Sequence, residues 1–180
     1  MAILTKVILQ SLLVAAATAT ALEPRAPCGE TAGKVCYGVD GGTSQNLDPD
    51  DIAYVATYLR FLGTNNTGSD KFWTMPPSVD CQEWTLPVTN AGTVLALAKH
   101  INPRINSSIL YTDLANTIDG GENASATDKA KSLTGCDKNG GQLGVIVDAN
   151  ALEYKTPEYI ASKAKHEGII IKLVRDPKAS

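Results

Sequence analysis

The sequence lacks the short motifs that mark the common enzyme classes. It contains no H-E-x-x-H pair, no G-x-S-x-G turn, no phosphate-binding loop and no dinucleotide-binding fingerprint. Histidine, a frequent acid–base catalyst, occurs only twice, as His100 and His166. These absences favour a protein that binds a partner over one that catalyses a reaction, and they indicate no cofactor.

A run of basic residues is also missing. The chain of 180 residues carries 16 Lys and Arg against 19 Asp and Glu, which gives a net charge of −3. A mildly acidic chain attracts neither phosphate backbones nor anionic membrane surfaces. We therefore expect no nucleic-acid partner and no association with a membrane.

Long apolar runs are absent except at the N-terminus. There Lys6 precedes the mostly apolar stretch Val7–Ala17, and Ala19-Thr20-Ala21 follows as a small-residue cleavage site. The apolar stretch is shorter than the roughly 20 residues that a membrane-spanning helix needs. This pattern predicts a signal peptide over residues 1–21 and a secreted, extracellular protein.

The next four residues, 22–25, read Leu-Glu-Pro-Arg and resemble the short Leu-x-x-Arg pro-segment of many secreted proteins of filamentous fungi. A cut after Arg25 leaves residues 26–180, with 14 basic and 18 acidic side chains and a net charge of −4. That length suffices for one domain with a substantial core. We expect a single secreted domain.

Four cysteines follow the signal peptide, namely Cys28, Cys36, Cys81 and Cys136. An even number in a secreted chain predicts two disulfides, for which three pairings exist. We predict Cys28–Cys36, which would close a small N-terminal loop, and Cys81–Cys136, which would join distant parts of the chain. Because no C-x-x-C pair is present, we predict no metal site.

Three triplets match the acceptor sequence for N-linked glycans. They begin at Asn65, Asn106 and Asn123, and all three lie near Gly, Pro or Ser. Such surroundings are typical of surface turns. The sequence therefore predicts three candidate glycosylation sites.

The clearest element is a helix from Asp48 to Gly63. Asp48 is a good N-cap and Pro49 suits the first helical position. Apolar residues then recur at helical spacing, at Ile52, Val55, Ala56, Leu59 and Leu62. Gly63 is expected to end the helix in a left-handed conformation. We expect this apolar stripe to pack on the rest of the domain.

The central part of the chain predicts shorter elements. Alternation predicts a strand over Gln82–Leu86, and we also expect a strand over Thr93–Ile101, which is β-branched at its start and Ala-rich after that. The double proline makes Phe72–Pro77 an edge or a loop. Ser107–Ile118 carries leucine and isoleucine at steps of four, which favours a helix, although a strand remains an alternative. Ala126–Leu133 is predicted to be a short polar helix.

The C-terminal third predicts a strand, a helix and a second strand. The strands are the apolar runs Leu143–Val147 and Ile169–Val174. Thr156 and Pro157 start the helix between them, which Gly168 would end. Such a βαβ-like segment allows parallel pairing through a right-handed crossover. The predicted fold class is α+β, a single compact domain with one helix on a small mixed or antiparallel sheet, and two disulfides.

One arrangement of motifs resembles a known enzyme family. The spacing Cys28-x7-Cys36-Tyr37, then a helix, then Gln82-Glu83-Trp84 is similar to the layout of fungal guanyl-specific extracellular ribonucleases. The resemblance covers residues 28–86 and implies one helix packed on an antiparallel sheet. It also implies that Glu83 is the general base that takes a proton from a ribose 2′-OH.

That family also requires an arginine and two histidines on neighbouring strands. Arg104 and His100 are the candidates in this chain, although His100 has no matching context. The strand that should end in histidine is either 143–148 or 115–119, and both end in aspartate. The resemblance therefore implies either a ribonuclease-like enzyme or a catalytically inactive relative.

The chain as a whole resembles small secreted cysteine-containing effector candidates of plant-associated fungi. This resemblance implies a protein that acts in the host apoplast, or at the cell surface, by binding something. We expect a monomer that binds a host protein such as a defence hydrolase. Trp73 and Met75, followed by two prolines, are the residues we expect at the interface, because large side chains dominate binding energy. A carbohydrate-binding protein would instead need exposed aromatic side chains in a row.

Overall fold

Five strands form one antiparallel sheet in the order β1-β6-β7-β4-β3, and a second sheet pairs β2 with β5. The computed structural model describes residues 28–179, so the predicted signal peptide and pro-segment lie outside the described residues. The strands are β1 (Val35–Cys36), β2 (Phe72–Met75), β3 (Glu83–Thr85), β4 (Val94–His100), β5 (Ser107–Leu110), β6 (Gly141–Gly144) and β7 (Ile169–Arg175). The helices are α1 (Pro49–Asn65), α2 (Tyr111–Asp119), α3 (Ala126–Lys131) and α4 (Pro157–Ala161), with 3₁₀ turns at Gly68–Lys71, Leu133–Asn139 and Leu152–Lys155.

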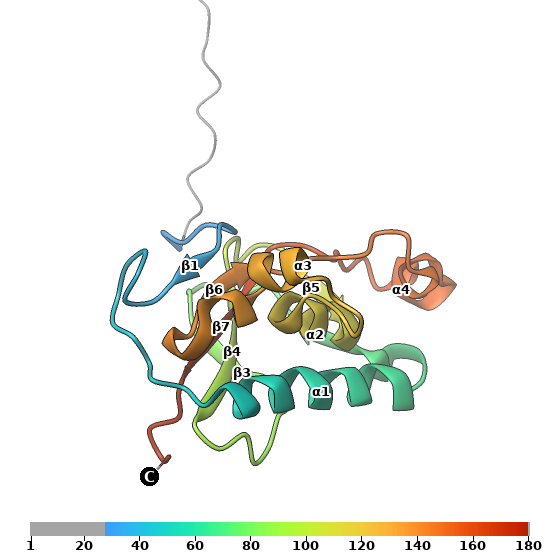
Figure 1. Ribbon diagram of the computed structural model, residues 1–180. Coiled ribbons are helices and arrows are strands. Elements are labelled where there is room, and N and C mark those ends of the chain that lie inside the picture. Colours follow the sequence, from blue (N-terminus) through green and yellow to red (C-terminus); the bar gives the residue numbers. More distant parts are fainter. Residues whose placement is uncertain (1–27, 180) are drawn as a thin grey trace, which may run out of the picture.

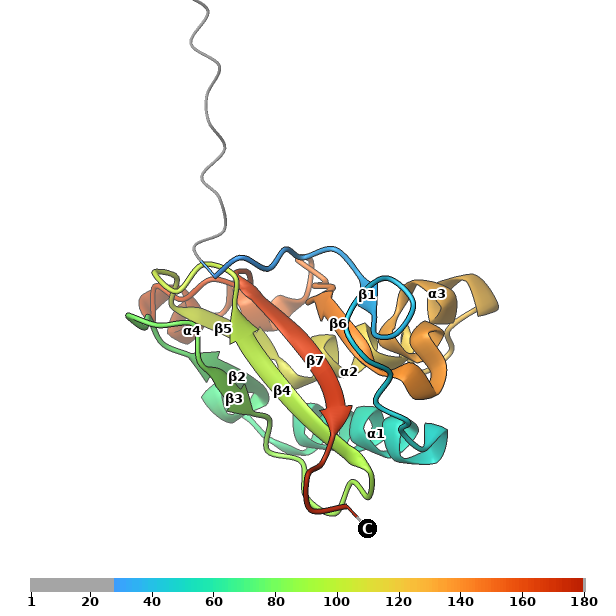
Figure 2. The same cartoon turned by 90° about the vertical axis from the view of Figure 1, so that its left-hand side faces the viewer.

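The fold is α+β, as predicted, but two helices rather than one cover the large sheet. Figures 1 and 2 show α1 and α2 side by side on one face of the sheet, while β4 and β7 form its centre. The side chains that point toward these helices, such as Ala98 and Ile171, are fully buried. Within residues 28–179 no helix is long and apolar enough to cross a membrane.

The beginning of α1 is as the sequence predicts. The Asp48 carboxylate accepts a hydrogen bond from the backbone N–H of Asp50 at 2.9 Å, and Pro49 occupies the first helical position. The predicted end is wrong, because the helix continues through Gly63 to Asn65. Gly63 is needed for packing instead: a Cβ atom there would lie 2.7 Å from the methyl carbon of Thr112 on α2.

The segment 107–118 is a strand followed by a helix, not one helix. β5 pairs with β2, which makes the segment 72–75 a strand, and α2 begins directly after Leu110. Ile109 is fully buried in the core and pairs with Trp73, so strand pairing overrides the helical spacing there. Gly120 ends α2 with a positive φ of 86°, a conformation that glycine adopts at little cost.

The order strand, helix, strand in the C-terminal third is confirmed, but the predicted parallel pairing is wrong. β6 and β7 are antiparallel, and α4 ends at Ala161 instead of near Gly168. The chain leaves the helix because the segment after it pairs with the start of β5. Lys165 lies beside Ser107, and its N–H donates to the Asn106 carbonyl oxygen at 2.8 Å. The connection thus returns to the end of the sheet that it left, whereas a parallel crossover must traverse the sheet.

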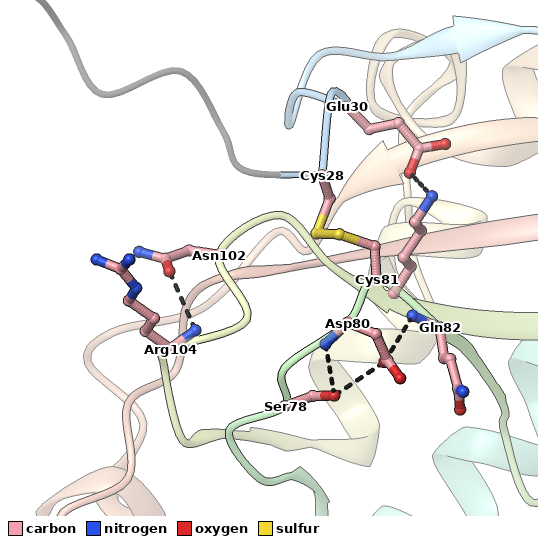
Figure 3. The surroundings of a disulfide bond; sticks show 9 residues. Cys28, Glu30, Ser78, Asp80, Cys81, Gln82, Asn102 and Arg104 are labelled. Atoms are coloured by element: carbon pink, nitrogen blue, oxygen red, sulfur yellow. Dashed lines mark hydrogen bonds and ion pairs between the residues drawn. A yellow bond between two sulfur atoms is a disulfide. The ribbon is translucent and has the colours of Figure 1, made fainter.

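The disulfide pairing also differs from the prediction. Cys28 bonds to Cys81, and Cys36 bonds to Cys136. Figure 3 shows Cys28 at the start of the described chain, held against the loop before β3. Cys36 lies on β1 and pairs across to Gly141 on β6, which places its sulfur next to the 3₁₀ turn that carries Cys136. Two disulfides are compatible with a secreted protein.

Removal of the Cys36–Cys136 disulfide should cost more stability than removal of Cys28–Cys81. The double variant Cys36→Ala, Cys136→Ala should lose about 4 kcal/mol of unfolding free energy, since it opens the longer loop. The double variant Cys28→Ala, Cys81→Ala should lose about 2 kcal/mol, because the N-terminal segment can detach locally. Urea denaturation measures both losses, and equal losses would contradict this ranking.

Substitution of Gly63 by alanine should destabilise the domain. In an exposed helix the change Gly→Ala stabilises by about 1 kcal/mol. At Gly63→Ala we instead expect a loss of about 2 kcal/mol, because the methyl group meets Thr112 and overpacks the contact between α1 and α2. Thr57→Ala, at an exposed position of the same helix, is the control and should change stability little. A Gly63→Ala variant as stable as the native chain would contradict the expected clash.

Candidate functional site

Glu83 lies on β3 with its carboxylate engaged in an ion-pair network. Lys172 on β7 contacts Glu83 at 2.6 Å and Glu30 at 3.0 Å, and Lys99 contacts Glu30 at 2.6 Å. Burial alone would raise the pKa of Glu30, but hydrogen bonds from both lysines outweigh it and lower that pKa. The network holds the N-terminal segment against the sheet, and Figure 2 shows that segment passing the start of β7.

The structure does not bring Glu83, His100 and Arg104 together. Glu83 is directly opposite Lys99, so His100, the next residue along β4, points to the other face of the sheet. His100 is 1 % exposed, and its Nε2 lies 3.0 Å from the Pro76 carbonyl oxygen. Arg104 is exposed in the turn after β4, and Figure 3 shows its guanidinium away from the disulfide. These three side chains form no acid–base pair.

The predicted interface residues Trp73 and Met75 lie mainly in the core. Met75 is 1 % exposed, so its assignment to a binding surface is wrong. Trp73 is half-buried and contacts Trp84 edge to face, with ring centroids 6.5 Å apart. Side chains along strand β2 point alternately to its two faces, and the pairing of β2 with β5 directs Met75 into the core.

The three candidate glycosylation sites differ in access. Asn65 and Asn123 are exposed, whereas Asn106 is half-buried. The amide nitrogen of Asn106 lies 3.5 Å from the Ser162 carbonyl, and Ser108 of the same triplet is buried. The structure therefore favours Asn65 and Asn123 as acceptors.

A cavity lies between α4 and the small sheet. We call it the α4 pocket. Its volume is about 410 Å³, and it is lined by the turn Gly68–Lys71, by residues of β2 and β5, and by the segment 153–162. Small-ligand pockets typically begin at about 300 Å³. The cavity is therefore large enough for an amino-acid side chain or a small molecule.

Aromatic rings form one wall of the α4 pocket. Phe72 and Tyr159 stack with centroids 5.0 Å apart, and Tyr154 packs edge to face on Tyr159 at 5.1 Å. The Tyr159 hydroxyl donates to the Ser108 carbonyl oxygen at 2.9 Å, which fixes the ring. Burial raises the pKa of Tyr159 to about 12, so this hydroxyl remains protonated at physiological pH.

Charged and hydroxyl groups line the rest of the pocket. Lys71 contacts Glu153 at 2.9 Å, and its hydrogen bond is the main reason why the pKa of Glu153 is lowered. Glu158 also lines the pocket and forms no ion pair within residues 28–179. The hydroxyl oxygens of Thr74 on β2 and Ser108 on β5 lie 2.8 Å apart. The pocket therefore carries one negative charge in excess.

A buried carboxylate supports the aromatic wall from behind. Asp113 on α2 is 3 % exposed and accepts a hydrogen bond from the Tyr154 hydroxyl at 2.7 Å. The same hydroxyl accepts from the Leu110 N–H at 2.9 Å, so Tyr154 is held on both sides. Burial raises the pKa of Asp113 despite the hydrogen bond from Tyr154, which acts in the opposite direction.

Sequence reasoning missed the α4 pocket. Its residues come from segments 67–74, 108 and 153–162, none of which carries a recognised motif. The only local signal was the clustering of Tyr154, Thr156, Glu158 and Tyr159 within six positions. The groups that the described residues bring to the pocket are carboxylates, a lysine, hydroxyls and aromatic rings.

Comparison with known proteins gives no further guide. No protein-family model matches the chain, and neither a curated protein nor a solved structure matches it.

The raised pKa of Asp113 predicts a pH-dependent stability. In the folded state this carboxyl binds its proton more tightly than the ordinary aspartate with a pKa of 3.8. As the pH rises, Asp113 of the unfolded chain loses its proton first, and Asp113 of the folded chain loses it only at a higher pH. The free energy of unfolding therefore falls as the pH rises from the pKa of the unfolded state to that of the folded state. Asp113→Asn cannot ionise, so the stability difference between native and variant should shift in favour of the variant between pH 3.5 and pH 7. Urea denaturation at several pH values measures this shift, and a constant difference would contradict it.

Proposed function

We propose that this chain is a secreted, effector-like binding protein that holds a basic side chain of an extracellular host protein in the α4 pocket. The observation that carries the proposal is the aromatic wall of Phe72 and Tyr159 beside the carboxylate of Glu158, which has no cationic partner within residues 28–179. An arginine or lysine over an aromatic face is attracted by the ring quadrupole. A carboxylate at the same site adds a charge-assisted hydrogen bond.

The remaining groups in the pocket suit a guanidinium or an ammonium group. The hydroxyl oxygens of Thr74 and Ser108 can accept N–H bonds after their mutual hydrogen bond at 2.8 Å reorients. Lys71 is already neutralised by Glu153, so it does not repel a cation strongly. The volume of about 410 Å³ accommodates one such side chain with its methylene stem.

The charge of the whole chain supports the same partner. Without residues 1–25 the net charge is −4, and an acidic surface increases the encounter rate with a basic protein. The two disulfides and the N-terminal apolar stretch support an extracellular site of action. A host defence protein in the plant apoplast, bound by a monomer of this chain, is the partner class that the sequence resemblance suggests.

The chemistry of the pocket is testable with a pair of small probes. N-acetyl-arginine amide should shift the NMR signals of Phe72 and Tyr159, whereas the citrulline analogue, which has the same shape but no charge, should not. Glu158→Lys should weaken arginine binding by about tenfold or more, because a like charge replaces the attracting carboxylate. Glu122→Lys makes the same change at an exposed position outside the pocket and should leave binding intact.

Equal shifts with arginine and citrulline would contradict the charge-based proposal, as would unchanged binding by the Glu158→Lys variant. The protein partner is tested separately. The tagged chain should retain host extracellular proteins that free arginine displaces, and the Glu158→Lys variant should retain none of these. Retention that arginine does not affect would assign the contact to another surface.

A further inference from the structure

Three aromatic side chains form a row on the exposed side of α1. Tyr54 and Tyr58 have ring centroids 5.9 Å apart, and Tyr58 and Phe61 have centroids 6.4 Å apart. Phe61 is 56 % exposed and Tyr54 is 38 % exposed. Neighbouring rings are tilted by 43° and 47°, so together they present a continuous apolar strip. We call these three residues the aromatic row.

The row lies on the side of α1 that faces away from the core, where the Tyr54 hydroxyl donates to the Thr89 carbonyl oxygen at 3.1 Å. The buried residues of α1, such as Val55 and Leu59, lie on the opposite side of the helix. Figure 1 shows α1 along the outer edge of the molecule with α2 on its inner side. A contiguous exposed apolar strip on a helix commonly marks a surface that something covers.

The next position of this strip is a glycosylation acceptor. Asn65 lies four residues after Phe61, one helical turn further on, and belongs to the triplet Asn65-Asn66-Thr67. Its amide nitrogen, the atom that carries an N-linked sugar, donates to the Phe61 carbonyl oxygen at 3.0 Å. Both Asn65 and Thr67 are exposed. The same amide nitrogen also donates to the Thr64 hydroxyl oxygen at 3.2 Å, so an attached sugar replaces one of these two hydrogen bonds.

Helix geometry sets the direction in which a glycan on Asn65 leaves. Side chains of an α-helix lean toward its N-terminus, which directs Asn65 back over Phe61 and then Tyr58. From Asn65 to Tyr58 is seven residues, or about 10 Å along the helix axis. Pyranose rings present flat C–H faces, and N-acetyl groups present a methyl, so both suit an aromatic surface.

We propose that an N-linked glycan on Asn65 folds back along α1 and covers Phe61 and Tyr58. The glycan then shields the aromatic row from water and blocks self-association through it. This inference depends on entry of the chain into the secretory pathway, but not on the α4 pocket. Asn123 is also exposed, and no aromatic pair of the described residues includes a neighbour of it in sequence, so it provides an internal comparison.

The test uses the full chain secreted from a eukaryotic host that adds high-mannose glycans. Peptide mass spectrometry should find Asn65 glycosylated. Hydroxyl-radical footprinting should then oxidise Phe61 and Tyr58 about threefold more slowly in the glycosylated protein than after complete enzymatic removal of the glycan. Trimming with endoglycosidase H, which leaves one sugar, should keep Phe61 protected and expose Tyr58.

Two variants control this experiment. Thr67→Ala prevents glycosylation but retains Asn65, and its row should be oxidised as fast as in the deglycosylated protein. Asn123→Gln removes a glycan elsewhere and should leave the protection of Phe61 and Tyr58 unchanged. An unmodified Asn65, or equal oxidation rates with and without the glycan, would overturn the proposal. So would protection seen only when soluble chitin oligomers are added, because the row would then bind an external sugar.

Discussion

The close approach of α1 and α2 at Gly63 is the contact on which the arrangement of the other elements depends. Because Gly63 has no side chain, Thr112 packs directly against the α1 backbone, and both helices fit on one face of the sheet. This contact sets the position of α2 and therefore of Asp113 near its start. It also turns the opposite side of α1, with Tyr54 and Phe61, toward solvent.

Asp113 in turn positions the segment that builds the α4 pocket. The 3₁₀ turn with Tyr154 and the short helix α4 are attached to the core by polar contacts, Tyr154 to Asp113 and Tyr159 to Ser108. Buried hydrogen bonds of this kind have strict geometry, and loss of one partner leaves the other unsatisfied. The aromatic wall is consequently held at a fixed place although α4 spans only five residues.

Local patterns in the sequence were sufficient for elements whose stabilisation is itself local. The N-cap of α1 at Asp48, the N-cap of α4 at Thr156 and the strand β4 were all predicted in place. Ser107–Leu110 was misassigned because its strand pairing with β2 comes from residues about 35 positions away, which no helical or alternating pattern within the segment reveals.

The sequence alone determined the α+β class and the number of disulfides, because these follow from the order of the local patterns and from the even count of cysteines. It also determined the start of α1 and the candidate glycan acceptors, because these depend on residue types close together in the chain. Only the tertiary structure decided which cysteines pair, since Cys36 meets Cys136 through the antiparallel contact of β1 with β6. It also paired Glu83 with Lys99, so that His100, the next residue on β4, faces the other side of the sheet. It assembled Phe72, Tyr159 and Glu158 into one pocket. Those outcomes depend on strand register and on long-range packing, and a one-residue change of register turns a side chain to the other face of a sheet.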